Sequence, residues 1–122
     1  MKKLFVYGTL MSGLDKEGRM NGAELTCAEC RTSRELSMYI YEGCPFVFEG
    51  RNRYRIKGEL YEVPDDMLKY LDEYEGDFYF RKMEEVECGD SVFTAFMYFG
   101  RGHFFGMKEV SGGDYRKFSG EK

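Results

Sequence analysis

The sequence predicts one α+β domain in which short strands form a small mixed, barrel-like β-sheet accompanied by few helices. The length of 122 residues suits a single domain over residues 1–122. Turn signals recur about every ten residues and separate short runs of strand-forming side chains. One segment, residues 64–76, has a clear helical pattern. Many strands and one good helix favour a curled sheet over a helical bundle.

The composition narrows the classes of protein. Aromatic residues make up 17% of the chain, with 11 Phe, 10 Tyr and no Trp, so we expect an interior built on aromatic rings. The net charge of −4 argues against a nucleic-acid partner. Apolar runs are too short for a membrane span, and Lys2 and Lys3 precede too few apolar residues for a signal peptide. We therefore expect a cytoplasmic protein with reduced thiols, no membrane partner and an oligomeric state that the sequence leaves open.

Four cysteines raise the question of a metal or redox site. Cys27 and Cys30 have the C-x-x-C spacing, but a structural zinc site needs four ligands. Cys44, Cys88 and the single histidine, His103, have no paired spacing of their own. We expect ordinary buried or half-buried thiols, no metal and no cofactor.

The first strand ends in a distinctive turn. Residues 4–7 are four consecutive apolar or aromatic side chains, which predicts a buried strand. Gly8 then lets the backbone turn, so the amides of Gly8, Thr9 and Leu10 lose their ladder partners. Successive free amides can form an anion-binding nest. The alternative is an ordinary turn after a core strand.

The middle of the chain predicts further strands. Residues 23–27 and 36–41 alternate between apolar and polar side chains, as half-buried strands do. A turn over residues 42–45 leads to a short strand, 46–48, and residues 51–63 read as another strand.

Four cations alternate along that last strand and share one face: Arg51, Arg53, Arg55 and Lys57. Because the chain is acidic overall, we interpret them as a solvated face, with a phosphate-binding strip for nucleic acid as the alternative.

The helix predicted over residues 64–76 has recognisable ends. Asp65 and Asp66 follow Pro64 and are expected to cap its N-terminus, and Gly76 is a natural stop. One face carries the apolar side chains of Met67, Leu68, Leu71 and Tyr74.

Two strands and a glycine-rich segment complete the chain. Residues 78–86 and 92–99 predict strands, the second of them central because it is nearly all apolar. Residues 100–120 hold six of the 15 glycines, so we expect residues 100–122 to be a loosely structured C-terminal tail.

Two motifs resemble one family. Tyr7-Gly8-Thr9-Leu10 is similar to the Tyr-Gly-Ser/Thr-Leu signature of the gamma-glutamylcyclotransferase-like family, which includes gamma-glutamylamine cyclotransferases and AIG2-like proteins. Residues 71–81 resemble its Leu-Asp-x-(Phe/Tyr)-Glu-Gly…Tyr-x-Arg segment. Four further pieces match in order along nearly the whole chain: residues 22–23, 43–45, 56–63 and 113–115.

The resemblance implies a fold, an activity and a site. The fold would be the small β-barrel with helices of this family, and the activity would be release of 5-oxoproline from a gamma-glutamyl compound, without a cofactor. Glu75 falls on the family's catalytic carboxylate. The substrate-binding residues would be Tyr7, Gly8, Thr9 and Leu10. Members that act on free gamma-glutamyl amino acids typically carry Asn after the Ser of the first motif, whereas Leu10 directly follows Thr9. This departure favours the amine and AIG2-like branch and leaves the leaving group open.

The local chemistry of Glu75 fits a general base. The negative end of the helix dipole and the nearby acids Asp72 and Glu73 should raise its pKa. The alternative for Glu75 alone is an exposed acid at a helix end. Tyr79, Arg81 and Tyr115 are second-tier candidates, and Arg81 could equally be a structural ion partner. For the whole protein, the alternatives are a non-catalytic small-ligand binding module or a cyclotransferase for another gamma-glutamylated metabolite.

Overall fold

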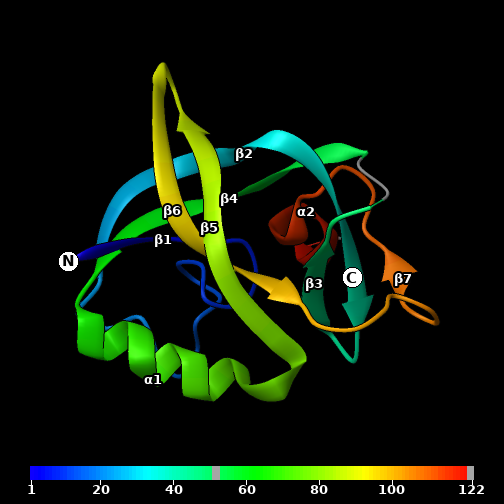
Figure 1. Cartoon of the computed structure of the whole chain (residues 1–122), viewed down its shortest axis with the longest axis horizontal. Helices are drawn as coiled ribbons and strands as arrows, with labels where there is room; N and C mark the ends of the chain where they lie inside the picture. The colour runs from blue at the N-terminus through cyan, green and yellow to red at the C-terminus, as the bar shows by residue number, and fades with distance from the viewer. Residues whose placement is uncertain (51–52, 121–122) are drawn as a thin grey trace.

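A computed structural model describes residues 1–50 and 53–120, and its strands curl into a barrel flanked by helices (Figure 1). The described elements are β1 (Lys2–Val6), β2 (Glu24–Tyr41), β3 (Cys44–Phe48), β4 (Tyr54–Val63), α1 (Asp65–Glu75), η1 (Gly76–Phe78, a 3₁₀ helix), β5 (Tyr79–Cys88), β6 (Ser91–Gly100), β7 (Lys108–Glu109) and α2 (Tyr115–Gly120). The α+β class is confirmed.

The barrel closes through one long strand. Neighbours follow the order β3-β2-β4-β1-β6-β5, and β5 pairs back onto β2. The β1–β6 pair is parallel and the other pairs are antiparallel, so the sheet is mixed, as predicted. The predicted central position of β6 is also confirmed, because β6 lies between β1 and β5. β3 and β7 flank the far end of β2.

Strand β2 differs from the prediction of two separate strands over residues 23–27 and 36–41. It runs without a break for 18 residues. Register shifts relative to β4 fall between Cys27 and Cys30 and between Arg31 and Glu35. These irregularities interrupt the alternation of side chains while pairing with β4 continues, which is why the pattern suggested a gap. Leu25 is exposed, although the alternation had placed it on the buried face.

Aromatic and aliphatic side chains from the barrel strands and α1 fill the core. Phe5, Leu60, Leu71 and Phe99 are almost completely buried. Gly58 is required where strands approach closely, because a Cβ atom at this position would lie 2.2 Å from the carbonyl oxygen of Val6. The predicted aromatic interior is therefore present, with aliphatic side chains between the rings.

Helix α1 agrees with the prediction except at its start. Leu68 and Leu71 are its buried residues, and Gly76 ends it with a φ of 64°. The residue at the N-cap is Pro64, which makes no side-chain capping bond. Asp65 and Asp66 therefore do not occupy the N-cap position, although Asp66 Oδ1 accepts a hydrogen bond from the Met67 amide at 3.0 Å. They lie inside the first turn, where their charge still favours the positive end of the helix.

The glycine-rich C-terminal segment, predicted as a loose tail over residues 100–122, laps over the barrel up to residue 120, with β7 and α2 as short regular elements among its turns. β7 pairs with β2, and the Val110 amide donates to the Met38 carbonyl at 2.8 Å. Val110 and Tyr115 are buried. Isolated apolar anchors between glycines hold this segment against the barrel, and such anchors leave no periodic signal in a sequence.

The cysteines also depart from the prediction of free thiols. Cys27 on β2 and Cys88 on β5 form a disulfide, while Cys30 is a buried thiol and Cys44 an exposed one. The pairing arises because the barrel closes where β2 meets β5, which brings together residues 61 positions apart. Cysteine spacing along the chain could not show this contact.

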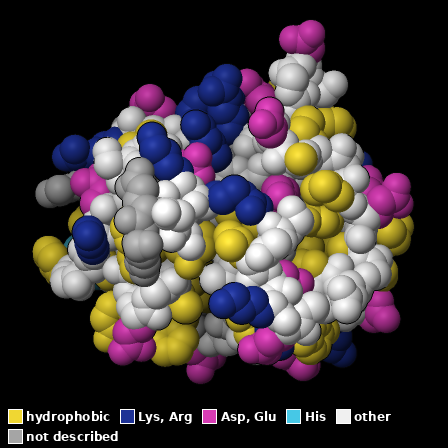
Figure 2. Space-filling model, turned by 180° about the vertical axis from the view of Figure 1, so that it is seen from behind, with side chains coloured by type: hydrophobic (Ala, Val, Ile, Leu, Met, Phe, Trp, Pro, Cys, Tyr) yellow, Lys and Arg dark blue, Asp and Glu magenta, His cyan; other side chains and the backbone are white. Residues whose placement is uncertain are grey.

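The cations of β4 and its approach are paired with acids. Arg53 contacts Glu109, Arg55 contacts Glu87 and Lys57 contacts Asp114. Arg51, the fourth cation of the predicted face, lies outside the described residues. Basic and acidic side chains also lie among one another over the face shown in Figure 2. No helix in the described part of the chain is long and apolar enough to cross a membrane.

Candidate active site

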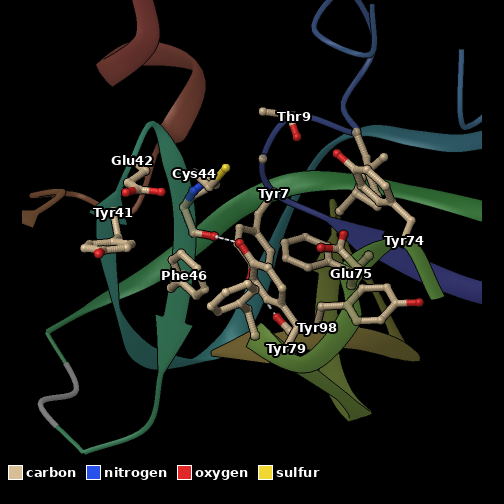
Figure 3. Close-up of a pocket in the computed structure, with 16 residues that line it drawn as sticks. Tyr7, Thr9, Tyr41, Glu42, Cys44, Phe46, Tyr74, Glu75, Tyr79 and Tyr98 are labelled. Atoms are coloured by element: carbon tan, nitrogen blue, oxygen red, sulfur yellow. Dashed lines mark hydrogen bonds between the residues drawn. The ribbon is translucent and has the colours of Figure 1, made fainter. Parts of the chain in front are cut away.

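A cavity of about 280 Å³ lies between the turn after β1 and the end of α1 (Figure 3). The five residues that the sequence singled out all line it: Tyr7, Gly8, Thr9, Leu10 and Glu75. Tyr79, one of the second-tier candidates, lines it as well. Segments nearly seventy positions apart in the sequence are therefore brought together around one hollow.

The turn after β1 lines the cavity with three successive residues, Gly8, Thr9 and Leu10. Gly8 lies against β3, where a Cβ atom would come 2.5 Å from Cγ of Pro45. The Met11 amide donates to the Gly8 carbonyl at 3.1 Å and closes the turn. Within residues 1–50 and 53–120, the amides of Gly8, Thr9 and Leu10 donate to no acceptor. They remain available to a negatively charged ligand group.

Glu75 lies in the last turn of α1 and lines the cavity, as Figure 3 shows. Burial raises the pKa of its carboxyl to about 7, and the charge of Arg19 opposes this rise. The pKa moves in the predicted direction, and burial is the cause that raises it, whereas the prediction rested on the helix dipole and on nearby acids. Arg19 itself stacks over the Tyr74 ring at 3.7 Å and bonds the Tyr70 hydroxyl at 2.7 Å.

Tyrosine hydroxyls fix the walls of the cavity. The Tyr7 hydroxyl donates to the Tyr98 carbonyl and the Tyr79 hydroxyl donates to the Pro45 carbonyl, each at 2.7 Å. Burial is the largest cause that raises the pKa of both phenols, so they stay neutral. The Tyr79 ring also stacks on Phe46 at 4.5 Å. These side chains form a rigid aromatic wall.

Several lining residues were missed by sequence reasoning. They come from the β2–β3 turn, β3, the end of α1, η1 and β6: Tyr41, Glu42, Cys44, Pro45, Phe46, Tyr74, Phe78 and Tyr98. Tyr98 stood in a nearly continuous apolar run, so no pattern marked its polar end. Pro45 belonged to a resemblance motif, yet its place against Gly8 required the fold.

The other two second-tier candidates lie outside the lining. Arg81 pairs with Asp72, with its Nε 3.0 Å from Oδ1, and stacks over Phe96. It is therefore a structural ion partner, one of the two roles considered. The Tyr115 hydroxyl donates to the Gly43 carbonyl at 3.0 Å and reaches the back of the β2–β3 turn rather than the cavity.

Among the described residues, the charged side chains that line the cavity are acidic. Its carboxylates are Glu42 and Glu75, and no Lys, Arg or His side chain of the described residues lines the cavity. Also within the described residues, no cluster of three or more His, Cys, Asp and Glu is arranged to hold a metal ion. An anionic ligand group in this cavity would therefore depend on backbone amides for hydrogen bonds, and the amides of Gly8, Thr9 and Leu10 are suitably free.

Fold and cavity together define a class: a small mixed β-barrel with a desolvated carboxylate at a helix end and a turn of free amides on the same cavity. The family model described as "Gamma-glutamyl cyclotransferase, AIG2-like" matches residues 4–117. The chain belongs to this family, as the two sequence motifs indicated.

Relatives support the assignment. The chain is 31% identical over 125 residues to the Methanocaldococcus jannaschii protein named "Putative gamma-glutamylcyclotransferase MJ1514", covering 98% of this chain and 100% of the other. YkqA from Bacillus subtilis has a similar structure, with a TM-score of 0.81 and 26% identity over 99% of this chain. This chain spans only 43% of the length of YkqA.

A mouse AIG2-like protein shares the fold. Its structure superposes with a TM-score of 0.79 at 22% identity, covering 92% of this chain and 87% of the other. At that identity the match establishes the fold alone, and it confirms the predicted gamma-glutamylcyclotransferase-like barrel.

Proposed function

We propose that the protein is a gamma-glutamylcyclotransferase that converts a gamma-glutamyl compound into 5-oxoproline and a free amine or amino acid. One observation carries the proposal: Glu75, with a pKa raised to about 7, lines the same cavity as the free amides of Gly8, Thr9 and Leu10. A proton acceptor and donors for an anion are the two groups that this cyclisation requires.

The reaction uses a nucleophile within the substrate. The α-amino nitrogen attacks the γ-carbonyl carbon and forms a new C–N bond, and the bond from that carbon to the leaving nitrogen then breaks. The α-nitrogen gives up two protons, one from the ammonium group before the attack and one after the new C–N bond has formed. Glu75 accepts each of them in turn and passes it to the leaving nitrogen, which departs as an ammonium ion, so the carboxylate is regenerated. A pKa near 7 suits both transfers. At neutral pH the carboxylate is basic enough to accept a proton, and the protonated carboxyl is acidic enough to give it back.

The cavity supplies the remaining contributions. Backbone amides of the Gly8–Leu10 turn hold either the tetrahedral oxyanion or the substrate α-carboxylate. The rigid wall of Tyr7 and Tyr79 keeps the substrate folded so that its amino group stays close to the γ-carbonyl, and such intramolecular positioning has a large effect on rate. A volume of about 280 Å³ suits a small substrate.

The direct test is incubation with a panel of gamma-glutamyl amines and amino acids, with both products followed by mass. We expect equal amounts of 5-oxoproline and leaving amine from at least one compound, and the best substrate identifies the leaving group. Thermal protection by a panel member without release of 5-oxoproline would instead support a binding module on the same fold. Neither turnover nor protection across the panel would overturn the proposal.

A further inference from the structure

The start of α2 contacts both segments that border the cavity. The Tyr115 hydroxyl donates to the Gly43 carbonyl at 3.0 Å, in the turn between β2 and β3. The next residue, Arg116, donates from Nη2 to the Ser12 carbonyl at 3.0 Å, just after the Gly8–Leu10 turn. Figure 3 shows Glu42 and Cys44, which flank Gly43, on a different side of the cavity from Thr9.

A buried carboxylate organises the contact at Ser12. Glu59 is only 4% exposed, and both of its oxygens are used. Oε1 accepts from the Ser12 amide at 2.8 Å and from the Tyr61 hydroxyl at 2.9 Å. Oε2 accepts from the Ser12 hydroxyl at 2.8 Å and from Arg116 Nη2 at 3.1 Å. Ser12 is therefore bound through its amide, its hydroxyl and its carbonyl.

The position of Ser12 bears directly on the free amides. Ser12 lies two residues after Leu10, and the intervening Met11 closes the turn onto the Gly8 carbonyl. A shift of Ser12 is transmitted through this short, closed turn to the amides of Thr9 and Leu10. Hydrogen bonds weaken steeply with distance and angle, so a small displacement lowers affinity for an anion.

We propose that Arg116, held by Glu59, is a positioning residue that keeps the Gly8–Leu10 turn in its substrate-binding geometry, while Tyr115 anchors the β2–β3 turn through Gly43. The inference rests on the proposed function for its substrate. Neither side chain lines the cavity, so both act through the backbone segments that they hold. The C-terminal segment thus sets the shape of the cavity without touching the reacting atoms.

A second ion pair in the chain provides a matched control. Glu84 on β5 is 7% exposed, and Arg34 binds it with Nε at 2.8 Å and Nη2 at 2.9 Å. The Arg34 and Arg116 side chains are similarly exposed, at 43% and 47%. Neither Arg34 nor Glu84 lines the cavity. Replacing either arginine leaves a buried glutamate without its cation, and of the two only Arg116 contacts Ser12, next to the Gly8–Leu10 turn.

The kinetic test compares Arg116→Ala, Arg34→Ala and Tyr115→Phe with the wild type. Losing the bonds of Arg116 should raise KM about tenfold, with a smaller fall in kcat, and leave the pH profile set by Glu75 in place. Tyr115→Phe, which keeps the ring, should raise KM about threefold. Arg34→Ala should lower the melting temperature without a change in KM. An unchanged KM in Arg116→Ala, or equal changes in both arginine variants, would overturn the proposal.

Amide hydrogen exchange tests the same inference without a substrate. The amides of Met11 and Ser12 donate to the Gly8 carbonyl and to Glu59, so their exchange reports on the turn. It should be faster in Arg116→Ala than in the wild type, unchanged in Arg34→Ala and closer to the wild type in Arg116→Lys. Equal exchange in all four proteins would overturn the positioning role even in an active enzyme. If no gamma-glutamyl compound is turned over, the proposed function fails, and this exchange comparison alone decides the positioning role.

Discussion

Carboxylates have different partners at the cavity and at the β2–β5 seam, the region where β2 pairs with β5 and closes the barrel. At the seam, Glu84 is bound by Arg34 and Glu87 by Arg55, and the Cys27–Cys88 disulfide lies beside them. At the cavity, Glu75 has no hydrogen bond or ion pair with any other described residue, and burial raises its pKa to about 7. The paired carboxylates at the seam hold strands together. The unpaired one keeps a proton that it can exchange near neutral pH.

This difference indicates that the fold tolerates a buried carboxyl group without a partner at the cavity. Burying a carboxyl group without a partner lowers stability, and proteins retain such groups mainly at functional sites. Glutamates therefore have two roles in this protein, and the partners of each side chain, rather than its position in the sequence, decide which role it has. Experiments that alter one region at a time test this separation.

The largest effect is expected from Glu75→Gln. Glutamine keeps the size of the side chain but cannot accept the proton, so kcat should fall about 100-fold or more. Glu84→Gln is the control from the seam: it should lower the melting temperature and leave kcat unchanged. Steady-state release of 5-oxoproline measures both. Full activity in Glu75→Gln would remove this residue from the mechanism.

The pH dependence of the rate should follow Glu75. Because the carboxylate form takes the proton from the substrate, kcat/KM should fall about tenfold per pH unit below pH 7. Rates measured between pH 5 and pH 8 would reveal the inflection. A profile flat down to pH 5 would show that the group titrates near its ordinary value and that the cavity does not desolvate it.

The stability of the folded protein should also depend on pH through the titration of Glu75. The pKa of Glu75 is higher in the folded protein, about 7, than its ordinary value of 4.5, so folding favours the protonated form. Its contribution to stability is complete below about pH 4.5 and is lost as the pH rises through 7. The melting temperature of Glu75→Gln should therefore rise relative to that of the wild type between pH 5 and pH 8. A constant difference between the two proteins would contradict the raised pKa.

The Gly8–Leu10 turn can be tested through its backbone. Thr9→Pro removes one amide, so KM should rise about tenfold or more. Thr9→Ser keeps the amide and a hydroxyl, and its KM should stay close to that of the wild type. Circular dichroism of both variants checks that the fold is retained. A Thr9→Pro variant with unchanged KM would exclude the Thr9 amide from substrate binding.

The smallest effect on turnover is expected at the seam. Cys88→Ser opens a loop closed over a separation of 61 residues, which should lower the free energy of unfolding by about 4 kcal/mol. Neither Cys27 nor Cys88 lines the cavity, so kcat at a temperature well below melting should not change. Chemical denaturation with and without a reducing agent provides the stability measurement. A matching loss of kcat would show that the seam and the cavity are coupled.

Sequence patterns predicted the parts of the fold that depend on local chemistry. The helical face of α1, its end at Gly76 and the apolar run of β1 were all evident. Patterns failed where tertiary pairing overrides local alternation, as in β2 with its register shifts, and where isolated anchors such as Val110 hold a glycine-rich segment. Those contacts join residues far apart, and single-segment periodicity carries no information about them.

For the site, the sequence by itself determined the chemical groups: a glycine turn with free amides and a glutamate just before a helix-ending glycine. Only the tertiary structure decided that these groups share one cavity, that burial raises the pKa of Glu75, and that Glu59 and Arg116 both bind Ser12 next to the turn. The physical reason is that covalent sequence specifies which atoms are present. Desolvation and hydrogen-bond geometry depend on distances between segments, and only the folded chain sets those distances.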